Sequence, residues 1–270
     1  MNSFLPRTRG VSHAPTAHRA AGNGRDPWAV PHVRQLREKI VRIGLKEFSP
    51  GGRLLELGCG VGDDTVIFAR GGFSVTATDP SQGMLRLAAV KTAPHRTAIR
   101  LQALHVADLS PLGEAAFEGV FSNFGSLNSI GNISRFFSQA RRIVVPGGAL
   151  VICLFGRWSP WEIAGFLLRA RGSEAFRRLA PSPVAVPAPG RPVPTWYHPA
   201  GKVIRAARPG FRLVRSLGVN VISPPPSSTT FALAYPRLTA ALRGFEPLLS
   251  GFRPFSRMGD HVVYVFRKTP

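Results

Sequence analysis

The sequence predicts an α/β fold, a doubly wound, Rossmann-like sheet of seven strands with helices on both faces. Two observations predict it. Between residues 53 and 154, short apolar runs alternate with segments of helical periodicity, and a glycine-rich turn separates the first run from the first helical segment. At 270 residues and 44% hydrophobic content, the chain is long enough for one large domain with a sizeable core.

The alternating segments define the expected order of the elements. A first helix is expected between Asp26-Pro27 and the stop at Pro50-Gly51-Gly52, because Val33, Leu36 and Ile40 recur at helical spacing. The expected strands then cover residues 54–57, 74–78, 99–105, 119–122 and 149–154, and the expected helices cover residues 64–70, 82–91, a short stretch near Leu112, and 133–144. Strands and helices that alternate at this pace form βαβ units and a parallel sheet.

The pattern is less regular after Phe155. Ser159-Pro160-Trp161-Glu162 has the form of a capping box and predicts a helix over residues 160–171 that Gly172 closes. Residues 181–194 are too rich in proline for a helix or a central strand and are expected to form an extended loop. A strand over 211–222, a helix over 235–249 and a last strand over 261–266 complete the domain. Residues 156–210 and 223–259 are therefore insertions in a domain that spans 27–270, and residues 1–26 are expected to form a disordered basic arm.

The composition is strongly basic, with a formal net charge of +21 and a pI near 11.7. A basic surface attracts polyanions such as nucleic acid or an anionic membrane face. The excess is nearly all Arg and is scattered along the chain, which is equally typical of the coding bias of a GC-rich genome.

Cys59 and Cys153 fall in an expected turn and an expected buried strand, so a disulfide framework and a metal cluster are not predicted. Without a signal peptide or a long apolar run, a soluble cytoplasmic protein is expected, with peripheral membrane contact left open.

The strongest chemical signal lies between the first strand and the first helix, where Gly58, Gly60 and Gly62 occupy alternate positions. Glycine lets a turn lie directly against a ligand, because no Cβ atom intervenes. A dinucleotide-binding turn would have glycine at the sixth position, which here is Asp63. An acid at the start of a helix opposes a phosphate and suits a cationic ligand.

The run from Leu54 to Thr65, LLELGCGVGDDT, resembles motif I of the class I S-adenosylmethionine-dependent methyltransferases. The resemblance implies the class I methyltransferase fold and S-adenosylmethionine as cofactor, with S-adenosylhomocysteine as product. It also implies that Glu56 orients the turn near the methionine moiety, while Gly58, Cys59, Gly60 and Gly62 pack against the cofactor.

Three further positions match this family in order, so that the resemblance covers residues 54–154. The second strand ends at Asp79, which by resemblance binds both ribose hydroxyls, with Pro80 to Met84 near the adenine. Asp108 follows the third strand and takes the role of the acid that accepts the adenine amino group, with Leu109 beside the ring. The fourth strand and the Pro146-Gly147-Gly148 turn complete the match, and they imply cofactor contacts from Ser122 and Asn123.

The methyl acceptor is expected at the loop after the fourth strand, which includes Phe124 and Asn128. This loop lacks the Asn-Pro-Pro-aromatic sequence with which many methyltransferases bind a planar nitrogen of a nucleic acid or protein, so a small molecule is favoured. Methyl transfer requires alignment, and a general base when the acceptor must lose a proton. His261 is the first candidate for the base, and Tyr197, His198 and His105 are the alternatives.

The two insertions are expected to cover the substrate, since such insertions commonly form the acceptor pocket in this fold. Trp161, Trp196 and Tyr197 are the substrate-binding candidates. The apolar and basic residues Trp158, Trp161, Phe166, Leu167, Leu168, Arg169 and Arg171 could line an acceptor pocket, touch a membrane interface or pack a helical lid on the core.

The expected function is in-line transfer of a methyl group to a small, apolar or aromatic metabolite, as in secondary or lipid and quinone metabolism. Two alternatives stay open. One is an RNA methyltransferase that uses the basic surface, and the other is a non-catalytic binding module that retains the cofactor fold. The pattern does not indicate an oligomeric state.

Overall fold

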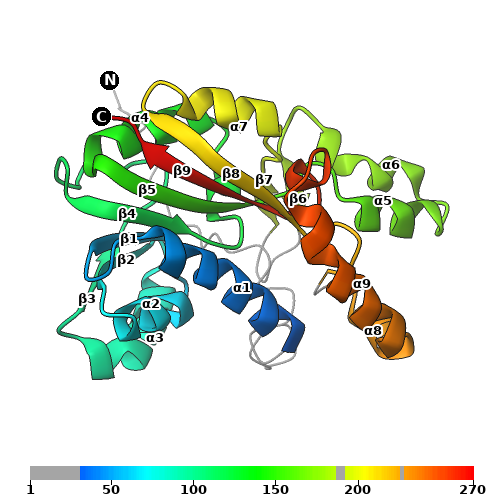
Figure 1. Cartoon of the computed structure of the whole chain (residues 1–270), viewed down its shortest axis with the longest axis horizontal. Helices are drawn as coiled ribbons and strands as arrows, with labels where there is room; N and C mark the ends of the chain where they lie inside the picture. The colour runs from blue at the N-terminus through cyan, green and yellow to red at the C-terminus, as the bar shows by residue number, and fades with distance from the viewer. Residues whose placement is uncertain (1–30, 187–191, 226–227) are drawn as a thin grey trace, which may run out of the picture.

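The computed structural model describes residues 31–186, 192–225 and 228–270, so the arm expected over residues 1–26 lies outside the described residues. One seven-stranded sheet forms the centre of the molecule, in the order β3-β2-β1-β4-β5-β9-β8 (Figure 1). Its strands are β1 (Arg53–Leu57), β2 (Ser74–Asp79), β3 (Ile99–Ala103), β4 (Phe117–Ser122), β5 (Val144–Phe155), β8 (Phe211–Val219) and β9 (His261–Lys268). This confirms the predicted seven-stranded, doubly wound sheet.

Helices cover both faces of the sheet. On one face lie α1 (Pro31–Glu47), α2 (Asp63–Arg70) and α3 (Gln82–Thr92), and on the other lie α4 (Ile133–Ile143) and α7 (Ala200–Ala207). Each face has its own apolar core: Leu36, Ile40 and Phe68 belong to the first, and Phe136 and Val203 belong to the second. The periodic apolar residues of α1 thus point into the core as their spacing predicts.

The direction of the strands brings the candidate site to one edge of the sheet. β1 pairs in parallel with β2 and with β4, and β4 pairs in parallel with β5. β9 runs antiparallel to β5, with His261 opposite Phe155. Because carboxyl ends of parallel strands meet at one edge, the residues that follow β1, β2, β4 and β5 share that edge with the start of β9.

The remaining elements lie mostly at this same edge, in the two insertions (Figure 1). The first insertion contains α5 (Pro160–Leu167), α6 (Gly172–Ala175), η6 (Arg177–Leu179) and a two-stranded sheet of β6 (Val184–Val186) and β7 (Val193–Thr195). The second contains α8 (Thr229–Ala234), α9 (Pro236–Ser250) and η7 (Phe255–Arg257), while η4 (Ala93–His95) and η5 (Ser126–Ser129) are short turns of the main domain.

Three elements differ from the sequence-based expectation. Near Leu112 the chain forms turns instead of a short helix, and the Arg142 side chain holds them by donating to the carbonyls of Leu112 and Leu109 at 2.7 and 2.8 Å. Residues 181–194 are not only an extended loop, since β6 and β7 pair within them. Residues 200–207, which the sequence does not assign to a helix, form α7, and α7 packs with α4 in the core.

The helix expected over residues 160–171 ends at Leu167, because Ala170 adopts a left-handed φ of 54°. Its capping box does not form. Ser159 makes no side-chain cap bond, and Glu162 instead binds Arg177 and Arg178, whose guanidinium groups are stronger partners than a backbone amide.

Within the described segments, no helix combines the length and the apolar composition that crossing a membrane requires. The same segments contain no group of three or more His, Cys, Asp or Glu side chains that could hold a metal ion.

His198, just before α7, makes the stability of the fold depend on pH. Its Nε2 donates to the carbonyl of Ile130 at 2.9 Å, and burial lowers its pKa to about 4. The unfolded chain, with an ordinary His pKa near about 6.5, binds a proton first as the pH falls. We therefore expect the free energy of unfolding to decrease between about pH 6.5 and pH 4, by up to about 3 kcal/mol from this residue.

Urea unfolding at pH 7.5 and 4.5 measures this loss. The variant His198→Gln can keep a donor for Ile130 but does not titrate, so it should lose less stability between the two pH values. An equal loss in both proteins would assign the acid sensitivity to other groups.

Candidate cofactor and acceptor site

The glycine turn after β1 has the backbone conformation that its sequence requires. Gly58, Gly60 and Gly62 have φ values of 74°, 56° and 84°, in the left-handed region that favours glycine. The amides of Gly58 and Cys59 both donate to the carbonyl of Thr78, at 2.8 and 2.9 Å. The turn is thereby fixed against the end of β2.

The carboxylate of Asp79 closes this turn from the side of β2. Its Oδ2 accepts the amide of Gly60 at 3.1 Å, and its Oδ1 accepts the amide of Ser81 at 2.8 Å. A carboxylate accepts hydrogen bonds from hydroxyl groups as well as from amides. Asp79 therefore joins the glycine turn to the start of α3 and is an acceptor suited to hydroxyl donors.

The side of the turn at Gly60 is open. A Cβ atom placed on Gly60 would meet no atom within 4 Å, whereas one on Gly58 would come within 2.1 Å of Ser126 Oγ. A Cβ on Gly62 would lie 3.3 Å from Ala88 Cβ. Gly58 and Gly62 are thus glycines for packing, and Gly60 is the place where a ligand can lie against the backbone.

Glu56, inside β1, is buried and orients the turn from behind. Its Oε2 accepts the hydroxyl of Thr65 at 2.6 Å, which ties β1 to α2. Burial, and next the negative charge of Asp64, raise the pKa of Glu56 to about 8. At neutral pH this side chain is therefore mostly protonated, and its expected place near a methionine moiety stays a prediction.

The acids at the start of α2 are neutralised by cations. Arg37 on α1 donates to Asp64 Oδ1 at 2.5 Å and lies 3.6 Å from Asp63 Oδ2, and Lys91 on α3 also pairs with Asp63. The charge that favours a cationic ligand at this turn is therefore carried by Asp79 more than by Asp63, contrary to the inference from the sequence.

Arg37 also fixes the loop after β4. Its guanidinium carbon lies 5.2 Å from the centre of the Phe124 ring. Asn123 donates through Nδ2 to Asp64 Oδ2 at 2.9 Å and accepts the amide of Phe124 at its own Oδ1. Phe124 has a left-handed φ of 48°. The predicted cofactor and acceptor loops thus meet through Arg37, which no motif of the sequence indicated because it lies on the helix before the glycine turn.

The residues expected at the adenine differ in where the structure places them. Pro80 and Met84 are half-buried beside Asp79, with the Met84 amide bonded to Ser81. Asp108, in contrast, is exposed and its Oδ1 accepts the amide of Ser110, which helps to lower its pKa. Leu109 is fully buried in the core under α4, so it leaves no surface for a ring.

His105 is the residue that β3 brings to this edge. The amide of its neighbour Leu104 donates to the carbonyl of Asp79. The His105 side chain is half-buried, its Nδ1 accepts the amide of Ala107, and burial lowers its pKa.

Most of the expected acceptor residues hold the insertions in place. Asn128 is fully buried, accepts the amide of Phe155 and donates to the carbonyl of Trp196, so the structure does not support its role in substrate binding. The Trp161 Nε1 donates to Ser228 at 3.0 Å, which joins the two insertions. The Trp196 ring packs at Gly131, away from the glycine turn.

A buried ion network lies between the first insertion and β9. Arg178 pairs with Glu162 at 2.5 Å and with Asp260 at 2.8 Å, and its guanidinium carbon lies 5.1 Å from the centre of the Tyr197 ring. Burial acts to raise the pKa of Asp260, but His261 and Arg178 outweigh it and hold that pKa well below its usual range. The network anchors the start of β9.

His261 begins β9 beside this network, with only 1% of the residue exposed. Its ring lies between those of Phe155 and Phe124, at centroid distances of 5.0 and 5.9 Å, and its Nδ1 lies 3.1 Å from Asp260 Oδ2. Neither ring nitrogen has a well-formed hydrogen bond among the described residues. The alternatives are less suited to accept a proton, since burial lowers the pKa of His198 and raises that of Tyr197.

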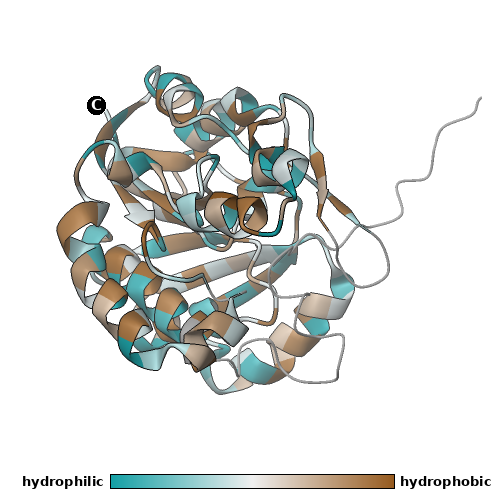
Figure 2. Ribbon diagram, turned by 90° about the vertical axis from the view of Figure 1, so that its right-hand side faces the viewer, coloured by the Kyte–Doolittle hydropathy of each residue, from teal (hydrophilic) through white to brown (hydrophobic). Residues whose placement is uncertain are grey.

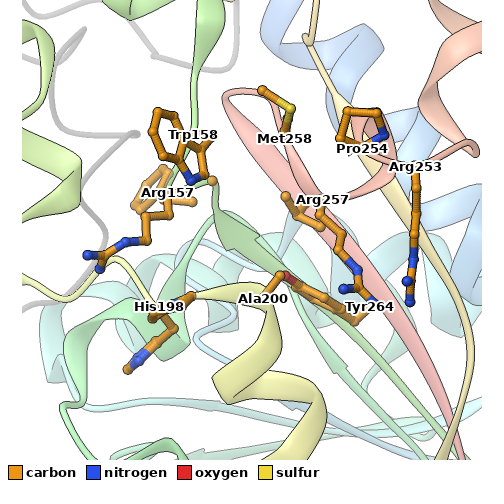
Figure 3. Close-up of a pocket in the computed structure, with 13 residues that line it drawn as sticks. Arg157, Trp158, His198, Ala200, Arg253, Pro254, Arg257, Met258 and Tyr264 are labelled. Atoms are coloured by element: carbon orange, nitrogen blue, oxygen red, sulfur yellow. The ribbon is translucent and has the colours of Figure 1, made fainter.

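Phe155 also lines a cavity of about 590 Å³, which Figure 3 shows. Its labelled walls combine the apolar groups of Trp158, Met258 and Tyr264 with the cationic groups of Arg157, Arg253 and Arg257. Sequence patterns singled out Trp158 alone of these residues, because the others come together only when the loop before β9 folds back over β5. The Phe155 ring that lines this cavity also packs against the ring of His261, with centroids 5.0 Å apart.

Comparisons with known proteins agree with this fold. A family model described as a methyltransferase domain matches residues 55–152. The chain is 33% identical over 117 residues to a demethylmenaquinone methyltransferase of Symbiobacterium thermophilum; the match covers 42% of this chain and 45% of that protein, so it spans less than half of the relative.

Solved structures share the fold at low identity. A putative S-adenosylmethionine-dependent methyltransferase from Listeria monocytogenes has a TM-score of 0.57 at 15% identity, covering 86% of this chain and all of that one. The 1,6-didemethyltoxoflavin-N1-methyltransferase of Burkholderia thailandensis, solved with its acceptor and S-adenosylhomocysteine, has a TM-score of 0.53 at 20% identity, covering 93% of this chain and 85% of that one. Residues 55–152 thus match a methyltransferase domain, and the fold of the chain is that of solved S-adenosylmethionine-dependent methyltransferases.

Proposed function

We propose that this chain transfers a methyl group from S-adenosylmethionine to a small, apolar, ring-shaped acceptor. One observation carries the proposal: the open backbone at Gly60 lies directly beside the fixed carboxylate of Asp79. A turn without a side chain, flanked by an acceptor for hydroxyl donors, fits a nucleoside with a cationic sulfur better than a pyrophosphate.

In this proposal the residues of the chain position the reactants. S-adenosylmethionine, when bound, supplies a methyl group on a sulfonium that is already a good leaving group. Asp79 would hold the ribose, Gly60 would lie against the cofactor, and Phe124 would lie beside the acceptor. Catalysis then consists mainly of proximity and alignment.

The acceptor class is inferred from the cavity that Phe155 lines. Its volume of about 590 Å³ is in the range of small-molecule sites, and its walls are mostly apolar with three arginines. An apolar ring with an acidic hydroxyl or another anionic group suits such walls. The relatives that act on demethylmenaquinone support a quinone-type acceptor.

The direct test is a transfer assay with S-adenosylmethionine labelled in its methyl group. Naphthohydroquinones that lack a ring methyl group and simple phenols serve as acceptors, and RNA from a bacterial extract serves as the competing class. We expect label in the quinol or phenol fraction. Label in RNA alone would contradict a small-molecule acceptor, and no label in any fraction with intact cofactor binding would support a non-catalytic module.

His261 is the proposed general base, because its ring is buried next to Phe124 with an unpartnered nitrogen. We expect His261→Gln to lower the rate of transfer to a hydroxyl acceptor by roughly 10²- to 10⁴-fold, the usual contribution of a general base. The affinity for S-adenosylhomocysteine should stay the same, since the residue does not hold the cofactor in this proposal.

Thermal unfolding of the variant separates catalysis from packing, because a general base can be lost without loss of the fold. An undiminished rate in the variant, in a protein that unfolds at the wild-type temperature, would assign His261 to the core alone.

A further inference from the structure

The second insertion carries an unusual number of exposed apolar side chains. On α8, α9 and the turn that follows, six large apolar residues are each between 49% and 79% exposed: Leu233, Tyr235, Leu238, Phe245, Leu248 and Phe252. Leu238, Phe245 and Leu248 recur at helical spacing on one face of α9, and Phe252 lies in the turn that follows it. Exposed apolar residues that gather in one place mark an interaction surface more often than residues that are scattered singly.

This surface is basic at its edges. Between residues 229 and 254 the sequence has three arginines and a single acid, Glu246. Glu246 is buried, where its carboxylate accepts the amides of Val221 and Ser223 at 2.7 and 3.1 Å. Arg237 and Arg253 are exposed. The surface therefore presents apolar groups and cations without an exposed carboxylate.

The first insertion extends this surface. Leu167, Leu168 and Phe176 are also exposed, next to Arg169 and to Arg171, which pairs with Glu174. The two insertions project from the same end of the molecule (Figure 1), and Figure 2 views the chain from that end.

The two insertions are joined by Trp161, whose Nε1 donates a hydrogen bond to Ser228. The Trp161 ring also packs edge-on against Phe231, with ring centroids 4.8 Å apart. We call this combined area on α5, α6, α8 and α9 the docking surface.

We infer that the docking surface binds the interface of an anionic lipid bilayer. Charge complementarity favours a bilayer over a second copy of the chain, because two copies would bring cations against cations in a protein of net charge +21. Apolar side chains with arginines at their edges are typical of helices that lie in the plane of a membrane interface.

Residues that neighbour the docking surface in the chain line the acceptor cavity. Trp158 and Arg253 line the cavity and are themselves exposed at its rim, between the two insertions. An apolar acceptor dissolved in a bilayer could thus enter from the membrane without crossing water. The docking itself does not depend on the proposed methyl transfer.

Co-sedimentation of the full chain with vesicles tests the inference without cofactor or acceptor. The wild type should bind vesicles of phosphatidylglycerol and phosphatidylcholine at least tenfold more tightly than vesicles of phosphatidylcholine alone. The double variant Leu248→Glu/Phe252→Glu should lose at least tenfold in affinity. Arg253→Gln should lose roughly fivefold, which corresponds to about 1 kcal/mol per cation at an anionic surface.

A matched control removes the effect of net charge. Leu87 and Val90 on α3 are 57% and 78% exposed, close to the 65% and 70% of Leu248 and Phe252. Leu87→Glu/Val90→Glu changes the net charge equally and should bind within twofold of the wild type. Equal losses in both double variants, or a wild type that does not bind anionic vesicles, would overturn the inference. So would a wild-type dimer in light scattering that only the docking-surface variant dissociates, because a second copy would then cover the surface.

Discussion

Replacement of Arg178 with Met is expected to lower the free energy of unfolding by about 3–5 kcal/mol, enough to unfold many proteins of this size at 37 °C. Arg178 is buried and is shared by Glu162 and Asp260, and it also donates to the carbonyl of Gly156. Without it, two carboxylates stay buried with fewer partners, and the cost of leaving them so exceeds any gain from the apolar side chain.

Urea unfolding at pH 7 measures this loss, with Arg171→Met as the control. Arg171 also pairs with a glutamate, Glu174, but both side chains are largely exposed. An exposed pair contributes at most about 1 kcal/mol, so this variant should be nearly as stable as the wild type. Similar losses in the two variants would show that the buried network does not anchor β9.

Replacement of Asp79 with Asn is expected to weaken the binding of S-adenosylhomocysteine by roughly 100-fold or more. A hydrogen bond to a charged group is worth about 1.5–3 kcal/mol, and a carboxylate that holds both ribose hydroxyls makes two of them. The asparagine side chain also has only one oxygen, whereas the backbone amides of Gly60 and Ser81 donate to two different carboxylate oxygens of Asp79. Calorimetric titration gives the affinity, and circular dichroism checks that the variant is folded.

Asp108→Asn is the informative control for this measurement. The family resemblance gives Asp108 a role at the adenine, whereas in the structure the residue is exposed and bonded to Ser110. We expect its affinity for S-adenosylhomocysteine to stay within a few-fold of the wild type. A loss as large as that of Asp79→Asn would instead assign Asp108 to the cofactor site.

The sequence predicted those features that depend on local patterns. The glycine turn, the acid at the end of β2 and the strands of the sheet are set by residues next to one another in the chain, so motif and periodicity were sufficient. His261 at the start of β9 was also found, because a strand that begins after a glycine is a local signal.

Features that depend on distant partners could not be predicted. Arg37 reaches Asp64 from another helix, and Glu162 pairs with Arg178 instead of capping the start of α5. Asn128 looked free for an acceptor, but its amide bonds the backbone of Phe155 and Trp196. In each case a polar side chain found a partner that no sequence spacing specifies, and burial made that partner obligatory.

The central claim is that a cofactor lies against Gly60, and the variants Gly60→Ala and Gly72→Ala test it most directly. Both glycines have a left-handed φ, and a Cβ at either would meet no protein atom within 4 Å. Each alanine should therefore lower the free energy of unfolding by a similar amount, about 1–2 kcal/mol. In calorimetric titration, the affinity for S-adenosylhomocysteine should fall about tenfold or more in Gly60→Ala and stay unchanged in Gly72→Ala. Wild-type affinity in Gly60→Ala would contradict the claim.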